Sequence, residues 1–277
     1  MTIAAAYLTS EGVVFGADSS TTVSVQSPTG KSEVAQLLNH AQKVFEIGEH
    51  SRLAACTWGA GSIGPFSHRT IIAQLAERID PAKTSVRDAA EMLSSIVAPN
   101  FSKADGNDFV GYYLGGWDVE SHVPSCFQVE IYKNQPPKIS ALGHGNCSFS
   151  GAPQFFTRVF RGYDQRLPEM LFGELTKRIP ASIDGEAFKK SFAEAFQHAS
   201  LPLLALGYQD LPIREAIDFV YSYLHITVKA LKFSFGAPLA GGPIEVGFVT
   251  SDRRFRWVRH KSFSSAILEE EADHELF

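Results

Sequence analysis

The chain has 277 residues, of which 44% are apolar and 20% are charged, and its formal net charge is −5. The length fits one large domain or two small ones, and the composition predicts a packed globular protein. A mildly acidic chain without a basic face is not expected to bind nucleic acid, and no apolar run approaches the roughly 20 residues that cross a bilayer.

The N-terminus and the cysteines predict the compartment. No basic segment precedes an apolar run at the N-terminus, so a secretory signal is not expected. The three cysteines, Cys56, Cys126 and Cys147, are widely separated and odd in number. Such spacing predicts neither a disulfide framework nor a zinc site. We therefore expect a protein of the reducing cytoplasm.

The first elements in chain order form a predicted hairpin. Residues 2–8 and 13–17 are apolar and flank a turn at residues 9–12, where glycine can take a positive φ. The second strand ends at Asp18. Residues 19–40, which are rich in Ser, Thr and Gln, predict a long loop.

The hydrophobic period distinguishes strands from helices along the rest of the chain. Short alternating or apolar runs predict strands at 43–47, 52–58, 108–117, 125–132, 138–142, 244–250 and 255–260. Helical spacing predicts helices at 65–79, 85–97, 167–178, 186–198 and 212–233. Thr84 or Ser85 is expected to cap the second helix. Blocks of strands and helices without a linker predict a single α+β domain, residues 1–277, in which helical layers flank antiparallel sheets.

The N-terminal residues carry the chemistry that the sequence suggests. Met1 precedes a small residue, so its removal is expected, and Thr2 then presents a hydroxyl and a free α-amine. A hydroxyl needs a base to become an effective nucleophile. An α-amine, whose ordinary pKa is about 7.7 to 8.0, is partly neutral near pH 7 and can act as that base. Thr2 thus supplies both a nucleophile and a base.

Three further residues are candidates for the groups that such a nucleophile needs. A nearby cation keeps the amine neutral, an anion fixes the cation, and a backbone N–H stabilises the developing oxyanion. The hairpin brings Asp18 beside Thr2, Lys43 begins the next strand, and Gly59 lies in a turn whose N–H can face a cleft. Taken singly, these are also an ordinary turn aspartate, an exposed strand lysine and a turn glycine.

In combination, these segments resemble the proteasome β-subunit family. Residues 2–18 resemble its N-terminal strand pair, in which the catalytic Thr and Asp are sixteen residues apart, as Thr2 and Asp18 are. Residues 43–47, Lys-Val-Phe-Glu-Ile, resemble the strand that opens with the catalytic Lys. Residues 54–61 resemble the strand and turn that hold the oxyanion glycine. Further segments match in the same order, at 110–118, 143–145 and 241–246.

The resemblance implies the fold and the assembly of that family. The implied fold is the four-layer α-β-β-α sandwich of the N-terminal-nucleophile (Ntn) hydrolases, with two antiparallel sheets between helical layers. The implied activity is threonine-type peptide hydrolysis, without a metal or organic cofactor, inside stacked homo-oligomeric rings. Polypeptides are the implied substrates, and an ATP-dependent unfoldase is a possible further partner.

The chain departs from the family pattern at several positions. The loop before Lys43 is longer, Ser20 stands where a basic residue is usual, and no Asp precedes the late Gly-Gly. His144 occupies the matched position of a helper serine in a Gly-Ser-Gly turn. It is either a catalytic proton shuttle, since histidine titrates near neutrality, or a turn histidine bound to the backbone.

Two segments extend beyond the family core. Residues 162–211 predict a helical insertion, at the ring surface or over the entrance to the site. Residues 266–277 predict an acidic C-terminal tail that is solvated or docks a partner. Two other interpretations stay open: a weak or inactive scaffold subunit that lacks the helper Ser and Asp, and an Ntn amidohydrolase that acts on a small amide.

Overall fold

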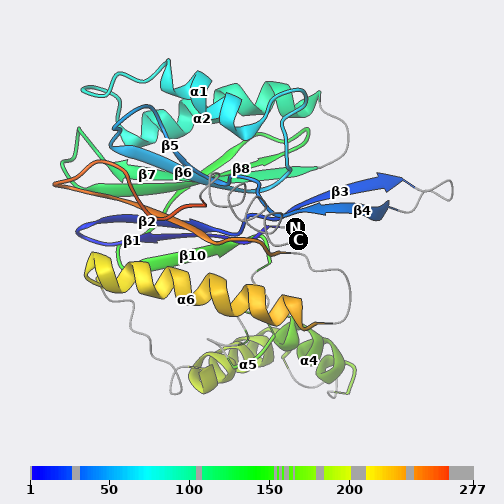
Figure 1. Cartoon of the computed structure of the whole chain (residues 1–277). Coiled ribbons are helices and arrows are strands. Elements are labelled where there is room, and N and C mark those ends of the chain that lie inside the picture. Colours follow the sequence, from blue (N-terminus) through cyan, green and yellow to red (C-terminus); the bar gives the residue numbers. More distant parts are fainter. Residues whose placement is uncertain are drawn as a thin grey trace, which may run out of the picture. The chain divides into compact units, whose positions relative to one another are not determined.

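The computed structural model describes residues 2–26, 32–103, 108–152, 155, 158, 162–164, 166–178, 184–200, 210–234 and 240–261 (Figure 1). The chain divides into two compact units, Met1–Gly151 with Asp210–Phe277, and Ala152–Gln209. The described residues form three sheets and five helices, which agrees with the predicted α+β class.

The first five-stranded sheet joins strands from both ends of the sequence. Its antiparallel order is β10 (Asn146–Ser150), β1 (Ala4–Leu8), β2 (Gly12–Ala17), β11 (Glu245–Thr250) and β12 (Arg256–Arg259). The predicted N-terminal hairpin is confirmed, because Ala4 lies opposite Ala17 and Leu8 opposite Val13. The β1–β2 hairpin therefore lies in the interior of this sheet.

The second five-stranded sheet is a meander of strands in sequence order. Its members are β5 (Val44–Glu46), β6 (Leu53–Gly59), β7 (Phe109–Trp117), β8 (Pro124–Tyr132) and β9 (Lys138–Ala141). Val44 lies opposite Cys56, so the residue before β5 lies near the end of β6.

The two sheets share a buried apolar core. Phe15 and Val13 of the first sheet pack in one cluster with Trp58, Tyr113 and Cys126 of the second. All five side chains are buried. Alternation along each strand directs these residues into the space between the sheets, so burial of this core holds one sheet against the other.

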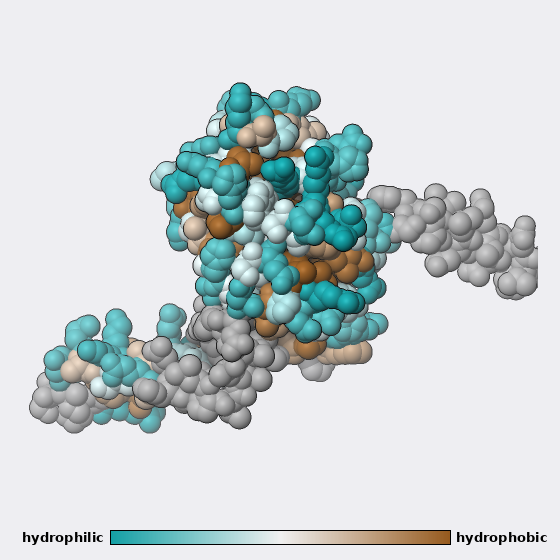
Figure 2. All heavy atoms as spheres, turned by 90° about the vertical axis from the view of Figure 1, so that its left-hand side faces the viewer, coloured by the Kyte–Doolittle hydropathy of each residue, from teal (hydrophilic) through white to brown (hydrophobic). Residues whose placement is uncertain are grey.

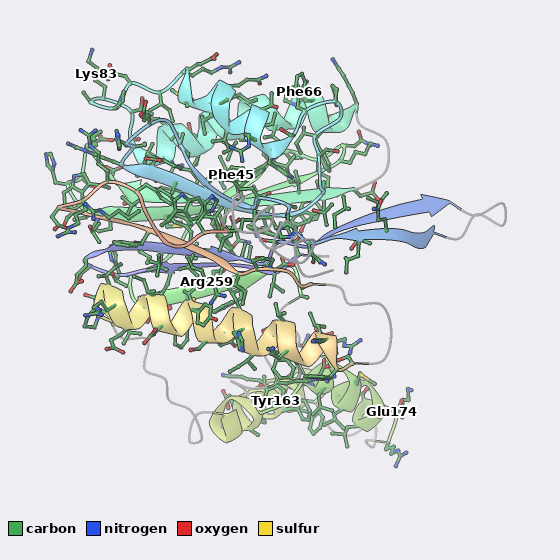
Figure 3. The ribbon with its side chains drawn as sticks, viewed as in Figure 1. Phe45, Phe66, Lys83, Tyr163, Glu174 and Arg259 are labelled. Carbon is green, nitrogen blue, oxygen red and sulfur yellow. The ribbon has the colours of Figure 1, made fainter. Side chains whose placement is uncertain are left out.

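Helices pack against the outer faces of the sheets (Figure 1). The second sheet is covered by α1 (His68–Ala76) and α2 (Val86–Ser102), and Phe45 of β5 lies beneath them (Figure 3). The first sheet is covered by α6 (Ile213–Lys232). A Cβ atom at Gly16 would lie 2.6 Å from Leu224 Cδ1, so α6 approaches β2 more closely than a side chain would allow.

The prediction of a long loop at residues 19–40 is wrong. This segment contains β3 (Thr21–Gln26) and β4 (Ser32–Leu38), which pair as a separate two-stranded sheet. Val23 and Leu38 are exposed, so these two apolar residues do not mark a buried face of the kind that identifies a strand in a sequence. Without that signal, the polar composition predicted a loop.

The second unit contains two helices, α4 (Leu167–Thr176) and α5 (Gly185–Ser200). Phe172 of α4 packs against Phe188 and Phe192 of α5, with ring centroids 5.9 and 5.8 Å apart. Both helices fall within residues 162–211, whose role as an insertion stays a prediction. The predicted tail at 266–277 lies outside the described residues. No helix in the described part of the chain is long and apolar enough to span a membrane.

The cap of α2 gives a first testable prediction. The Ser85 side chain accepts a hydrogen bond from the N–H of Asp88 at 3.1 Å, which identifies Ser85 as the N-cap. Ser85→Ala leaves this N–H without its acceptor and is expected to lower the free energy of unfolding by about 1 kcal/mol, measured by urea denaturation. Ser95→Ala, on the exposed face of the same helix, should change it by less than about 0.5 kcal/mol. Equal losses in the two variants would contradict the capping role.

Candidate active site

The Asp18 carboxylate gathers donors from four parts of the chain. Its Oδ1 accepts from Lys43 Nζ at 2.7 Å and from the N–H of Ile3 at 3.0 Å. Its Oδ2 accepts from Ser20 Oγ at 2.7 Å, from the N–H of Ser20 at 3.1 Å and from the N–H of Gly241 at 2.9 Å. Asp18 is fully buried, and five donors replace the water that a buried carboxylate loses. It is thus the anchor of the group.

Lys43 reaches Asp18 from the other sheet. Asp18 directly follows β2 and Lys43 directly precedes β5, so their ion pair joins the two sheets. Both side chains are buried, and Lys43 Nζ also donates to the carbonyl of Ser20. Burial lowers the pKa of Lys43 below its ordinary value, while the Asp18 charge acts in the opposite direction. The structure thus brings these two sequence-predicted residues into contact.

Thr2 lies at the end of β1 where this pair is located. The N–H of Ile3 and Lys43 Nζ share the same Asp18 oxygen, so the ammonium is next to the Thr2–Ile3 peptide. Thr2 is 8% exposed. On its other side, Gly151 has a φ of +95°, and a Cβ atom there would lie 1.6 Å from the Thr2 carbonyl oxygen. Only glycine therefore fits beside the backbone of Thr2.

Gly59 lies at the same end of the second sheet. The N–H of Thr57 donates to the carbonyl of Lys43 at 3.0 Å, which places Lys43 two residues from Gly59 across the ladder. Gly59 is exposed, has a φ of +91°, and has no room for a Cβ atom beside the carbonyl of Phe109. The chain therefore turns sharply where β6 ends, close to Lys43.

A buried histidine holds the residue that follows this turn. His68 Nε2 lies 2.8 Å from the carbonyl oxygen of Ala60, and Nδ1 lies 2.8 Å from the Tyr112 hydroxyl. Because a carbonyl only accepts, Nε2 carries the proton and Nδ1 accepts from the hydroxyl. Burial is the main reason that the pKa of His68 falls to about 4. The sequence did not single out this role, because a histidine at a helix start carries no such signal.

His144 is a predicted site residue that the structure does not bring beside Thr2. The N–H of Gly145 donates to the carbonyl of Leu8, at the end of β1 opposite to Thr2. At that end of the strand, the pKa of the Asp210 carboxyl lies below its ordinary value. The chief cause is that Ser10 donates hydrogen bonds to it, and His144 lowers the pKa further. Figure 2 views this end of the sheets, where hydrophilic side chains cover most of the face.

The residues that do lie beside Thr2 follow a strand that the sequence did not predict. Because β10 ends at Ser150, the next residue, Gly151, lies against Thr2. The segment Asn146–Ser150 has polar residues at alternate positions and is followed by a glycine. This alternation is the sequence signal that could have indicated the strand. The N–H of Gly241 was likewise not expected as a partner of Asp18.

The arrangement has the groups that acyl transfer requires. A threonine at a strand start, a buried cation held by a carboxylate, and a sharp glycine turn meet at one end of the two sheets. Such a cation can stabilise a developing alkoxide, and a backbone N–H can stabilise an oxyanion. Among the described residues, no three His, Cys, Asp or Glu side chains are grouped so as to hold a metal ion.

Comparisons with known proteins give a likeness of fold. No protein-family model matches the chain, and no curated protein matches it. An Anbu (Gly-1) mutant from Hyphomicrobium sp. strain MC1 is similar in structure, with a TM-score of 0.53, 13% identity, and coverage of 99% of this chain and 100% of that one. Anbu (ancestral beta-subunit) from Yersinia bercovieri is similar with a TM-score of 0.50, 14% identity, and coverage of 100% and 95%. At these identities the likeness concerns the fold alone.

The buried ion pair predicts a stability pattern. Lys43→Met or Asp18→Asn leaves one buried charge unpaired and should lower the free energy of unfolding by about 3 to 5 kcal/mol in urea denaturation. The double variant should lose less than the sum of the single losses, because no charge then lacks its partner. The exposed pair Arg87–Glu91 serves as the control, with a coupling of about 0.5 kcal/mol or less. Additive losses at Asp18 and Lys43 would contradict the coupling.

His68 predicts a dependence of stability on pH. The unfolded chain takes up a proton at His68 near pH 6.5, whereas the folded chain takes it up only near pH 4. Stability should therefore fall as the pH drops through this window, by up to about 3 kcal/mol from this residue. The difference in unfolding free energy between wild type and His68→Gln, measured at several pH values, should show this slope. His50→Gln, at an exposed position, should leave the slope unchanged.

Proposed function

We propose that the protein is an Ntn hydrolase with the four-layer α-β-β-α fold, and that it cleaves peptide bonds with Thr2 as its N-terminal nucleophile. The observation that carries this proposal is the buried Asp18–Lys43 pair, which is bonded to the peptide that follows Thr2. Helices on the outer faces of two facing sheets support the fold, as does the likeness to the two Anbu structures.

The proposed reaction is acyl transfer to a threonine. After Met1 is removed, Thr2 Oγ attacks the carbonyl carbon of the substrate's peptide bond. The hydroxyl proton of Thr2 passes to the Thr2 α-amine, directly or through a water. The amine then gives that proton to the leaving amine as the C–N bond breaks. Water hydrolyses the resulting ester and restores Thr2. Lys43 supplies positive potential at the nucleophile, and Asp18 fixes its position.

Gly59 is the proposed donor to the oxyanion. Its positive φ turns the chain at the end of β6, and the bond from His68 to Ala60 fixes the following residue. An N–H donor to a tetrahedral oxyanion is typically worth about 3 to 4 kcal/mol. His144 has no part in this mechanism, because it lies at the other end of β1.

We further propose that the protein assembles into stacked homo-oligomeric rings and takes polypeptides as substrates in the cytoplasm. The support is the sequence resemblance to proteasome β-subunits, together with the fold of a protein described as an ancestral beta-subunit. An unfoldase that delivers substrates is part of the same proposal. A native mass of several hundred kilodaltons would agree with rings, whereas a monomer or dimer would favour the small-amide hydrolase.

The test of the nucleophile uses an epoxyketone, which reacts with a hydroxyl and a free amine on one residue. Intact mass spectrometry should show a chain without Met1 and a single adduct that maps to Thr2. Thr2→Ala should form no adduct and should lose peptidase activity by at least about a thousandfold while remaining folded. Thr70→Ala, an exposed threonine on α1, should behave as wild type.

Two outcomes would overturn the proposal. Full activity in Thr2→Ala would show that another group attacks the substrate. A chain that has lost Met1 but forms no adduct would indicate an inactive scaffold subunit.

A further inference from the structure

A second buried ion pair lies next to the first. We propose that Lys261 and Glu245 are positioning residues, which fasten the segments that carry Asp18 and Lys43 to each other and balance the charge around the Lys43 ammonium. The effect on turnover rests on the proposed function, whereas the effect on Lys43 does not.

Lys261 bonds to both segments of the first pair. Its Nζ donates to Ser19 Oγ at 3.2 Å and to the carbonyl of Ala41 at 2.8 Å. Ser19 directly follows Asp18, and Ala41 lies two residues before Lys43. The N–H of Ala41 also donates to the carbonyl of Ser19 at 2.9 Å. One ammonium group therefore bonds to both of the chain segments that carry the Asp18–Lys43 ion pair.

Glu245 is the anion that fixes Lys261. It is the first residue of β11, lies opposite Ala17 and is fully buried. Its Oε1 lies 3.2 Å from Lys261 Nζ and 2.8 Å from His260 Nδ1. The Lys261 side chain is 4% exposed. A buried lysine that is held this way repeats the arrangement of Lys43 and Asp18 one strand further along the first sheet.

The two pairs act on each other electrostatically. The positive charge of Lys261 lowers the pKa of Lys43, and the negative charge of Glu245 raises it, beside the larger effects of burial and of Asp18. Burial is the largest effect on the pKa of Lys261 and lowers it, as does Arg69, whereas the charges of Glu245 and Asp18 raise it. The charged and titratable groups of this cluster are Asp18, Lys43, Arg69, Glu245, His260 and Lys261.

If Lys261 and Glu245 balance the charge around Lys43, removing either one should change the pKa of Lys43, and the two changes should be opposite in direction. Removing Lys261 takes a positive charge away and leaves Glu245, so the pKa of Lys43 should rise. Removing the charge of Glu245 leaves Lys261, so the pKa of Lys43 should fall. A pair that only packed the fold would not shift Lys43 in opposite directions.

The experiment follows the Lys43 ammonium by NMR in the full chain with isotope-labelled lysine, assigned with Lys43→Met. The pKa of Lys43 is expected to rise in Lys261→Met, to fall in Glu245→Gln and to return near the wild-type value in the double variant. The matched control is Lys83→Met, an exposed lysine far from the site (Figure 3), which should leave it unchanged. Shifts in the same direction in both single variants would overturn the proposal. If Lys261→Met does not fold, the proposal is tested by the fall in the Lys43 pKa expected in Glu245→Gln and by its return in the double variant.

The second readout is the rate of epoxyketone addition at Thr2. Lys261→Met should slow it by about tenfold or more, because Lys43 and Asp18 lose their common tether, and Lys261→Arg should restore part of the rate. An unchanged rate in Lys261→Met would overturn the positioning role. If the wild-type protein forms no adduct, the proposed function fails, and the titration of Lys43 still tests the pair.

Discussion

The ion pair between Asp18 and Lys43 is the constraint on which the arrangement of the site depends. Each partner comes from a different sheet, and each is buried, so neither charge is tolerable without the other. Asp18 also accepts hydrogen bonds from the backbone N–H groups of Ile3, Ser20 and Gly241. The apolar core brings the sheets together over a large area, and this pair fixes where their ends meet.

Two further buried side chains bond to the segments that carry this pair and Gly59. The ammonium of Lys261 donates to the Ser19 hydroxyl, next to Asp18, and to the carbonyl of Ala41, two residues before Lys43, and His68 bonds to the carbonyl of Ala60 beside Gly59. Each of these side chains acts on a backbone segment and does not approach Thr2 through any described contact. The residues around Thr2 are thus held in place by side chains from β11, α1 and the segment after β12.

The sequence predicted the parts of the site that depend on local pairing. Thr2 and Asp18 meet because a two-strand hairpin fixes their register, and the apolar runs of that hairpin are unambiguous. His144 was a candidate because its Gly-His-Gly turn was matched to the helper-serine turn, whereas β10 carries too few apolar residues to be predicted and so gave no sign of which residues lie beside Thr2. Glu245 and Lys261 were missed since a charged residue in or after a late strand looks solvated until its neighbours are known.

The strand order of the first sheet also bears on the timing of synthesis. β2 pairs with β11, so a nascent chain carries β1 and β2 for most of its translation before their neighbour emerges from the ribosome. During that interval Asp18 lacks the N–H of Gly241, and β2 has an open edge. The set of donors around Asp18 is therefore completed only after the C-terminal part of the chain has been made.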